Sequence, residues 1–292
     1  YIRGCMLEFY PPTLADKDLF PKHSRYLAYN YYYSYVHLWS QQIGITIAKN
    51  DTALYMHLRD DDCFLLPITD DLPKAMSELE EHSARTGLRF QLECVPESEA
   101  LKLQELGYSI QHVRNLDDYL YESSKLTKLS GRKLQAKRNH ISQFERTYTY
   151  TVRSLSKPEM RQECYEMAST RWLENHGEVD QSIINELRAI RRTFDNWDEL
   201  GFVGMLVCVD NELTAFTVGE IIDERLAIVH FEKGDTSYHG VYSVINQLFV
   251  SEFLRDVQYV NRQEDAGVDG LRKAKLSYQP DLMVRKYRIT KP

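Results

Sequence analysis

The chain has no long apolar run, and its cysteines are few and scattered. No stretch of the 292 residues approaches the roughly 18 apolar residues that a membrane-spanning helix needs. The beginning of the sequence shows no charged-then-apolar pattern of a secretory signal. The five cysteines have no CxxC spacing, so we interpret them as reduced packing residues. These absences predict an intracellular, cytoplasmic protein.

Several short enzyme motifs are also missing. The sequence contains no GxSxG elbow, no P-loop, no HExxH and no zinc-type spacing of Cys and His. Hydrolase, nucleoside-triphosphatase and metal-site interpretations are therefore disfavoured, and we predict no metal site. The formal net charge of −7 similarly disfavours a general nucleic-acid-coating role.

The cations are unevenly distributed along this acidic chain. Seven Lys and Arg residues lie between positions 125 and 146 against one carboxylate, Glu145. A second basic segment near the end contains Arg285, Lys286 and Arg288. Such gathering indicates either an anionic ligand or a locally solvated face.

The predicted elements follow the same order in the two halves of the chain. In the first half we expect an aromatic helical segment at 14–41, strands at 44–49, 53–58 and 63–68, a helix at 72–86, a strand at 89–94, a helix at 97–105 and strands at 108–113 and 119–121. In the second half we expect a helix at 129–148, a strand at 149–155, helices at 157–174 and 181–196, strands at 202–209, 213–222 and 226–233, a helix at 240–254, a strand at 257–260, a helix at 270–277 and a strand at 282–289. The repeated order predicts two copies of one α+β fold with mixed sheets, divided into residues 1–124 and 125–292.

Two lysines occupy positions where the helical pattern expects apolar side chains. Lys275 shares a face with Leu271, Ala274 and Tyr278, and Lys137 projects from the apolar stripe of the basic helix at 129–148, which connects the two halves. Burying an ammonium is costly unless it finds a partner. Each lysine therefore indicates either an internal ion pair or a site that holds an anion.

Two basic segments and one aromatic segment are similar to a known family. Residues 129–140 (LSGRKLQAKRNH), 261–280 (NRQEDAGVDGLRKAKLSYQP) and 30–39 (NYYYSYVHLW) resemble the family of the phosphatidylglycerol lysyltransferase C-terminal domain (DUF2156). The resemblance covers nearly the whole chain. It implies two tandem GNAT-like domains (the acyl-CoA N-acyltransferase fold), of which the second carries the active site and the first is non-catalytic. It also implies transfer of an acyl or aminoacyl group, which in the lysyltransferase members is lysine moved from charged tRNA to a lipid headgroup.

The GNAT fold that this resemblance implies suggests where the donor lies. In that fold the strand before the central helix parts from the next strand, and the acyl donor occupies the gap with its pyrophosphate at the helix N-terminus. Here the corresponding link is 233–242 (KGDTSYHGVY), where Gly234 and Gly240 allow close backbone approach. Because the link departs from the glycine-spaced acetyl-CoA loop, we favour aminoacyl-tRNA over acyl-CoA as the donor. The acceptor and the oligomeric state are left open by the sequence.

Candidate site residues fall into two groups. The expected contacts to phosphate or carboxylate are Lys137, Arg138, Arg262, Arg272 and Lys275. The expected groups for proton transfer, oxyanion stabilisation and positioning are Glu220, Glu232, Tyr278 and Asn246, with His230 and Glu264 as further candidates. Two alternatives remain: a non-catalytic module that binds an anion or RNA, and cations that only close internal ion pairs.

Overall fold

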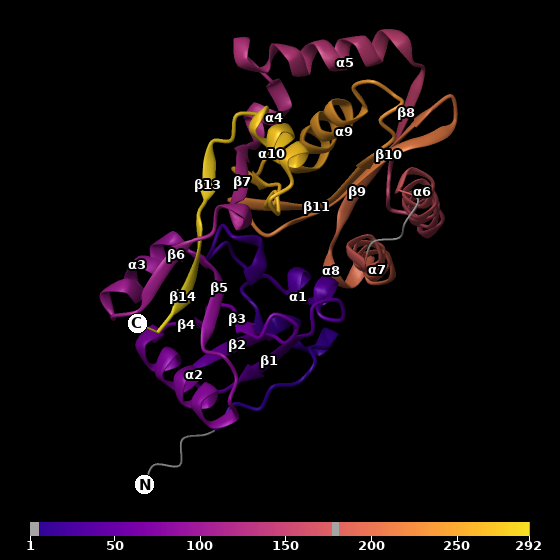
Figure 1. Ribbon diagram of the computed structural model, residues 1–292. Helices are drawn as coiled ribbons and strands as arrows, with labels where there is room; N and C mark the ends of the chain where they lie inside the picture. The colour runs from indigo at the N-terminus through magenta and orange to yellow at the C-terminus, as the bar shows by residue number, and fades with distance from the viewer. Residues whose placement is uncertain (1–5, 177–180, 292) are drawn as a thin grey trace. The chain divides into compact units, whose positions relative to one another are not determined.

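The computed structural model describes residues 6–176 and 181–291 and contains two compact units (Figure 1). Unit 1 comprises Tyr1–Asp118 together with Val284–Pro292, and unit 2 comprises Tyr119–Met283. Each unit contains a seven-stranded sheet with both parallel and antiparallel pairs. The predicted α+β class with mixed sheets is therefore confirmed.

The sheet of unit 1 is an antiparallel meander followed by a parallel crossover. Its strands are β1 (Ile45–Lys49), β2 (Ala53–Leu58), β3 (Cys63–Phe64), β4 (Ile68–Thr69), β5 (Gln91–Pro96), β6 (Ser109–His112) and β14 (Lys286–Thr290). Strands β1, β2 and β3 pair antiparallel, and β3 pairs parallel to β5 through Phe64 and Leu92. Helix α2 (Leu72–Thr86) forms the crossover between these parallel strands, and β14 lies between β5 and β6.

The sheet of unit 2 repeats this plan. Its strands are β7 (Asp118–Glu122), β8 (Tyr150–Ser154), β9 (Val203–Val209), β10 (Glu212–Ile221), β11 (Leu226–Gly234), β12 (Tyr259–Asn261) and β13 (Leu282–Val284). Strands β9, β10 and β11 form the antiparallel meander, and helix α9 (Val241–Phe249) crosses over to β12, which is parallel to β11. Strand β7 then pairs antiparallel with β12.

Helix α9 packs on the sheet of unit 2 through an apolar stripe. Val241, Val244, Ile245 and Phe249 recur at helical spacing, and all four are buried. They form one core with Phe144 of helix α5 (Gln135–Thr147). Helix α10 (Asp269–Leu276) lies on the same side of the sheet as α9, whereas α6 (Pro158–His176) and α7 (Gln181–Asp195) cover the other side (Figure 1).

Further helices and short helical turns connect these elements. They are α1 (Tyr33–Trp39), α3 (Glu97–Glu105), α4 (Ser123–Lys128), α8 (Trp197–Leu200), the 3-10 turns η1 (Leu14–Leu19), η2 (Tyr29–Tyr31), η3 (Arg114–Leu116) and η4 (Arg132–Leu134), and the π-helical segment η5 (Val250–Leu254). The sequence predicted one helical segment at 14–41, but the structure has two 3-10 turns and one short α-helix there. The basic helix predicted at 129–148 begins later, at Gln135, because Leu129 has a left-handed φ of 48° that no helix interior tolerates.

The final strand of the chain belongs to the first unit. A contiguous division at residues 124 and 125 does not describe this arrangement, since unit 1 ends at Asp118 and regains Val284–Pro292. The stretch predicted as one strand at 282–289 is two strands: β13 pairs with β7, and β14 pairs with β5 and β6. Element order alone carries no information on which sheet a terminal strand joins.

The aromatic segment and the cysteines are packing residues. Tyr29, Tyr31, Tyr32, Tyr33 and Tyr35 are all buried in unit 1. The free thiols Cys63, Cys94, Cys164 and Cys208 are buried as well, and Cys5 lies outside the described residues. Within the described ranges, no helix combines the length and apolar character needed to cross a membrane.

Candidate active site

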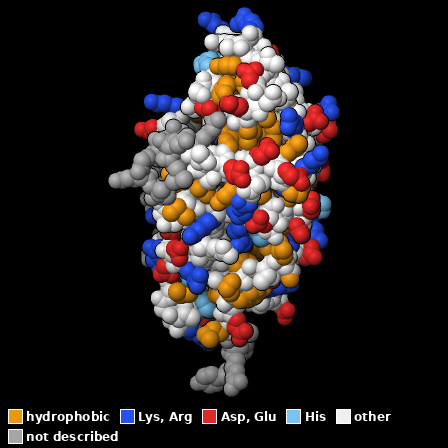
Figure 2. Space-filling model, turned by 90° about the vertical axis from the view of Figure 1, so that its right-hand side faces the viewer, with side chains coloured by type: hydrophobic (Ala, Val, Ile, Leu, Met, Phe, Trp, Pro, Cys, Tyr) orange, Lys and Arg blue, Asp and Glu red, His pale blue; other side chains and the backbone are white. Residues whose placement is uncertain are grey.

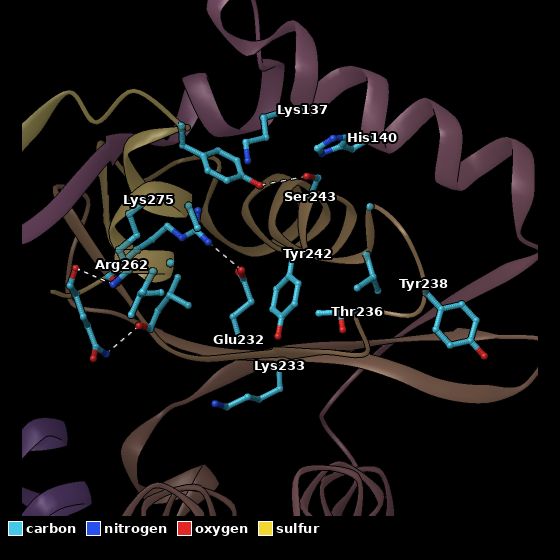
Figure 3. Close-up of a pocket in the computed structure, with 18 of the residues that line it drawn as sticks. Lys137, His140, Glu232, Lys233, Thr236, Tyr238, Tyr242, Ser243, Arg262 and Lys275 are labelled. Atoms are coloured by element: carbon cyan, nitrogen blue, oxygen red, sulfur yellow. Dashed lines mark hydrogen bonds and ion pairs between the residues drawn. The ribbon is translucent and has the colours of Figure 1, made fainter. Parts of the chain in front are cut away.

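A cavity of about 750 Å³ opens in unit 2 where β11 and β12 part (Figure 3). The two strands pair in parallel only as far as Ile228 and Asn261. Beyond that point β11 continues to Gly234, while the chain after β12 turns toward α10. The cavity is lined by α5, by Glu186 of α7, by the second half of β11, by the first turn of α9 with the loop before it, and by residues 262–278.

A bulge in β11 marks the floor of the cavity. Val218 pairs with Phe231 and Gly219 pairs with Val229, so His230 is an extra residue on the β11 side. Bulges of this kind bend a strand and are frequent beside active sites. His230 lines the cavity, and its Nε2 lies 3.0 Å from Glu220 Oε1.

Glu220 itself is 8% exposed and is not among the lining residues. In the structure this carboxylate anchors His230. It therefore has no direct route to a ligand in the cavity.

Glu232, Arg262 and Asn246 form a connected group across the strand gap. Arg262 Nη2 donates to Glu232 Oε1 at 2.8 Å, and Asn246 Nδ2 donates to Glu232 Oε2 at 3.1 Å. Burial is the largest single influence on Arg262 and opposes its charge, but Glu232, Tyr278 and Tyr121 together outweigh burial and raise the pKa of the guanidinium. Glu232 and Arg262 line the cavity, whereas Asn246 is buried behind Glu232.

Lys137 reaches the cavity from α5 and lies against Tyr278. Its Nζ is 4.1 Å from the centroid of the Tyr278 ring, and Arg262 Cζ is 4.8 Å from the same centroid. Burial, and secondarily the nearby Arg262 charge, lowers the pKa of Lys137. Burial raises the pKa of Tyr278, so its hydroxyl remains an O–H donor at neutral pH; it lies 3.5 Å from Ser243 Oγ.

Lys275 fastens the loop that follows β12. Its Nζ donates to the backbone oxygens of Arg262 at 2.6 Å, of Gln263 at 3.1 Å and of Glu264. Gln263 has a left-handed φ of 62°, and its Nε2 donates to Val229 O at 2.9 Å, inside the strand gap. A non-glycine residue in this conformation is often found at ligand-binding sites. The inward lysine thus shapes the cavity wall, and its ammonium already has backbone acceptors.

Arg138 and Arg272 lie outside the lining. Arg138 donates to Leu129 O and Gly131 O in the turn before α5. Arg272 makes a bidentate contact with the fully buried Asp265, with distances of 2.8 and 2.9 Å. Both arginines are occupied by internal acceptors, so the structure assigns them to loop anchoring.

The two glycines of the link before α9 allow close packing. A Cβ on Gly240 would lie 2.5 Å from His140 O, and Gly240 has a φ of 90° that glycine adopts without strain. A Cβ on Gly234 would lie 3.0 Å from the Val241 side chain. Gly240 lines the cavity and Gly234 does not.

A histidine pair at the cavity was missed by the sequence analysis. The rings of His140 and His239 meet edge to face with centroids 4.9 Å apart, and both residues line the cavity. Burial, then His239 and Lys137, lowers the pKa of His140, so this imidazole is neutral at pH 7. The two histidines end the segments LSGRKLQAKRNH and KGDTSYH, 99 positions apart, and only the fold brings them together. No group of three or more side chains suited to a metal ion is found in the described part of the chain.

The repeated meander, crossover helix and parting parallel strands define a tandem GNAT-like protein. The chain belongs to the family described as phosphatidylglycerol lysyltransferase, C-terminal, whose model matches residues 24–290. It is similar to a crystal structure of a conserved protein of unknown function from Bacteroides thetaiotaomicron, with 31% identity, a TM-score of 0.90 and coverage of 98% of this chain and 100% of that one.

More distant relatives share the fold. The structure of L-PGS from Bacillus licheniformis has 15% identity, a TM-score of 0.55 and coverage of 85% of this chain and 80% of that one. The C-terminal (DUF2156) domain assigned to a lysylphosphatidylglycerol synthetase of Agrobacterium fabrum has 15% identity, a TM-score of 0.64 and coverage of 89% and 87%. An uncharacterized protein of Mycoplasmoides gallisepticum is 25% identical over 69% of this chain and 68% of its own length. Family and fold together indicate a transferase.

Proposed function

We propose that the chain is an aminoacyltransferase that takes an aminoacyl group from a charged tRNA and passes it to an amine or hydroxyl acceptor in the cavity of unit 2. Family membership and the GNAT-like fold support a transferase in general. The site geometry supports this choice of donor.

The choice of donor is supported by the side chains that occupy the gap between β11 and β12. In the GNAT arrangement an acyl-CoA donor threads its pantetheine arm between the parting strands. Here Gln263 Nε2 already bonds Val229 O at 2.9 Å in that gap, and the Arg262–Glu232 pair lies just beyond it. An aminoacyl ester needs only its acyl end to enter the cavity, so these contacts need not break. The geometry therefore favours the ester donor over coenzyme A.

The cavity supplies groups for the transfer step. The acceptor nitrogen or oxygen attacks the ester carbonyl and forms the new acyl bond, the bond from that carbonyl to the ribose oxygen breaks, and the acceptor's proton passes to the ribose oxygen. Neutral His140 is suited to carry this proton. Tyr278 keeps its O–H proton and is suited to donate to the developing oxyanion.

Exposed cations near the cavity suit the nucleic-acid part of the donor. Lys128, Arg132, Lys133 and Arg146 are exposed on the segment that contains α4 and α5. In Figure 2, some Lys and Arg side chains project at the top of the view, where Figure 1 draws α5, and others are scattered over the rest of this face. Contacts from such side chains to phosphates would make donor binding weaken steeply with salt.

A donor panel tests the proposal. The purified chain is incubated with charged tRNAs, each labelled in the aminoacyl group, and separately with labelled acyl-CoAs, together with mixed amine and hydroxyl acceptors. We expect protein-dependent loss of an aminoacyl ester, strongly reduced in His140→Ala and retained in the exposed control Asn139→Ala. Consumption of acyl-CoA alone would overturn the choice of donor. Retention of tRNA without turnover of any donor would instead indicate a non-catalytic RNA-binding module.

A further inference from the structure

We propose that the cavity of unit 2 receives a substrate group that carries negative charge, a carboxylate or a phosphate monoester, between Lys137 Nζ and Arg262 Nη1, and that it rejects a lysyl side chain. This inference rests on the proposed transferase function and specifies its substrate class. The charge could belong to the transferred group or to the acceptor.

The guanidinium of Arg262 is only half satisfied. Its Nη2 is bonded to Glu232, whereas its Nη1 is buried and has no hydrogen-bond acceptor in the described part of the chain. The second oxygen of Glu232 accepts from Asn246 and not from Nη1. A buried charged donor without an acceptor is costly. An anionic oxygen brought in by a ligand would give Nη1 the acceptor that it lacks.

Lys137 is a second cation beside Arg262 whose charge is not matched by a carboxylate of its own. Among the described residues no carboxylate lies within ion-pair distance of its Nζ, which rests on the Tyr278 ring 4.1 Å from the centroid. Arg262 lies against the same ring, so its positive charge repels that of Lys137 and disfavours the charged form of the lysine. Glu232 is the one carboxylate that acts on both cations. An anion placed near both cations would offset this repulsion.

The complete lining carries an excess of positive charge. Four Lys or Arg side chains and three Glu side chains line the cavity. Glu186 pairs with Lys233 at 2.6 Å, and Glu232 pairs with Arg262 at 2.8 Å. A lysyl ammonium entering this space would add a like charge and would have to compete with cations already in place. The charge balance therefore disfavours binding of a lysyl side chain, although the family is named for lysine transfer.

Matched five-carbon probes test the sign of the charge. Binding of glutarate and of 1,5-diaminopentane to the full chain is measured by calorimetry. We expect glutarate to bind and the diamine not to bind. Lys137→Met should weaken glutarate binding by about tenfold or more, the loss of one charged contact, and Lys137→Glu should abolish it. The control Lys157→Met, at an exposed lysine of unit 2 outside the cavity lining, should leave binding unchanged.

The outcomes are distinct from those of the donor panel. Binding of the diamine, or glutarate binding that Lys137→Met leaves intact while circular dichroism shows a folded protein, would overturn the anion site. Faster consumption of lysyl-tRNA than of glutamyl-tRNA would overturn it too, while leaving the transferase proposal standing. Glutarate binding without any aminoacyl transfer would support the anion site and overturn the transferase proposal. Lys137-dependent use of glutamyl-tRNA would place the anion on the donor, and use of alanyl-tRNA only with carboxylate acceptors would place it on the acceptor.

Discussion

The two units share one plan of strands but differ in what fills the gap between the parting parallel strands. In unit 1 the Tyr31 hydroxyl donates to Cys94 O of β5 at 3.0 Å, and the backbone N–H of Leu66, just beyond β3, donates to the Tyr31 hydroxyl oxygen. Tyr31 is fully buried. In unit 2 the equivalent gap, beside Val229 and Gln263, borders the cavity. The same strand arrangement thus borders either a filled core or a cavity, depending on the side chains placed in the gap.

Inward cations differ between the units in the same way. Lys286 of unit 1 is fully buried, and its Nζ contacts Asp118 Oδ1 and Asn30 Oδ1, each at 2.6 Å. Its neighbours Arg285 and Arg288 pair with Glu97 and Glu93. All three cations of the second basic segment therefore form ion pairs within unit 1. Among the described residues of unit 2, no carboxylate pairs with Lys137 in this way, so the completeness of the partners separates the structural cation Lys286 from the cation that we propose binds a ligand.

The largest expected effect follows from breaking the sealed pair of unit 1. Lys286→Met leaves Asp118 buried without its cation, and removing one partner of a buried pair costs about 3–5 kcal/mol. We expect a loss of this size in the free energy of unfolding, measured by urea denaturation. Lys291→Met is the matched control, because Lys291 pairs with Glu80 at the surface and such pairs contribute about 0–1 kcal/mol. Equal losses in the two variants would mean that the buried pair does not stabilise unit 1.

A smaller loss is expected from emptying the gap of unit 1. Tyr31→Phe removes only the hydroxyl and leaves two backbone groups without this partner, which costs about 1–3 kcal/mol. Denaturation midpoints of the variant and the parent chain give the difference. Tyr10→Phe is the control, since its exposed hydroxyl contacts Asp16 and surface changes usually stay within about 0.5 kcal/mol. Aminoacyl transfer should be unchanged in both; lost transfer in folded Tyr31→Phe would connect unit 1 to catalysis.

Much of the fold could be predicted because it follows local patterns. The apolar periodicity predicts where strands and helices alternate. The same element order in both halves predicted two GNAT-like copies. The same reasoning identified Lys137 and Lys275 as cations on apolar faces, and the structure places both at the cavity with Glu232, Arg262 and Tyr278. A charged side chain at an apolar position is a signal that one sequence can show.

The remaining features depend on contacts between distant segments. Arg272 was indistinguishable from Arg262 in sequence, yet a buried Asp265 seven residues before it takes up its guanidinium. Arg138 likewise finds backbone acceptors in a turn whose left-handed residues the helical pattern concealed. The histidine pair and the final strand's place in unit 1 arise from pairings over about a hundred residues or more, for which a local pattern carries no signal.

The smallest expected effect has the opposite sign to the first. Replacing Lys137 by Met removes a disfavoured charge and leaves a side chain of similar length. Because Lys137 is only half-buried and solvent screens part of the penalty, we expect stability at pH 7 to rise by at most about 1 kcal/mol while glutarate binding falls. The sign follows from linkage: because burial and Arg262 lower the folded-state pKa of Lys137, the parent chain bears the penalty below that pKa. The parent then regains stability as the pH rises from there toward the ordinary lysine value.

The advantage of Lys137→Met should consequently shrink as the pH approaches the ordinary lysine range, and unfolding curves at pH 7, 8 and 9 measure this trend. Lys133→Met provides the reference, since Lys133 is exposed in the same segment and its removal should change stability little at any pH. A Lys137→Met variant less stable than its parent at pH 7 would show that the ammonium is well satisfied in the folded chain. In that case Lys137 would resemble the internally paired Lys286, and the proposed difference between the inward cations of the two units would be wrong.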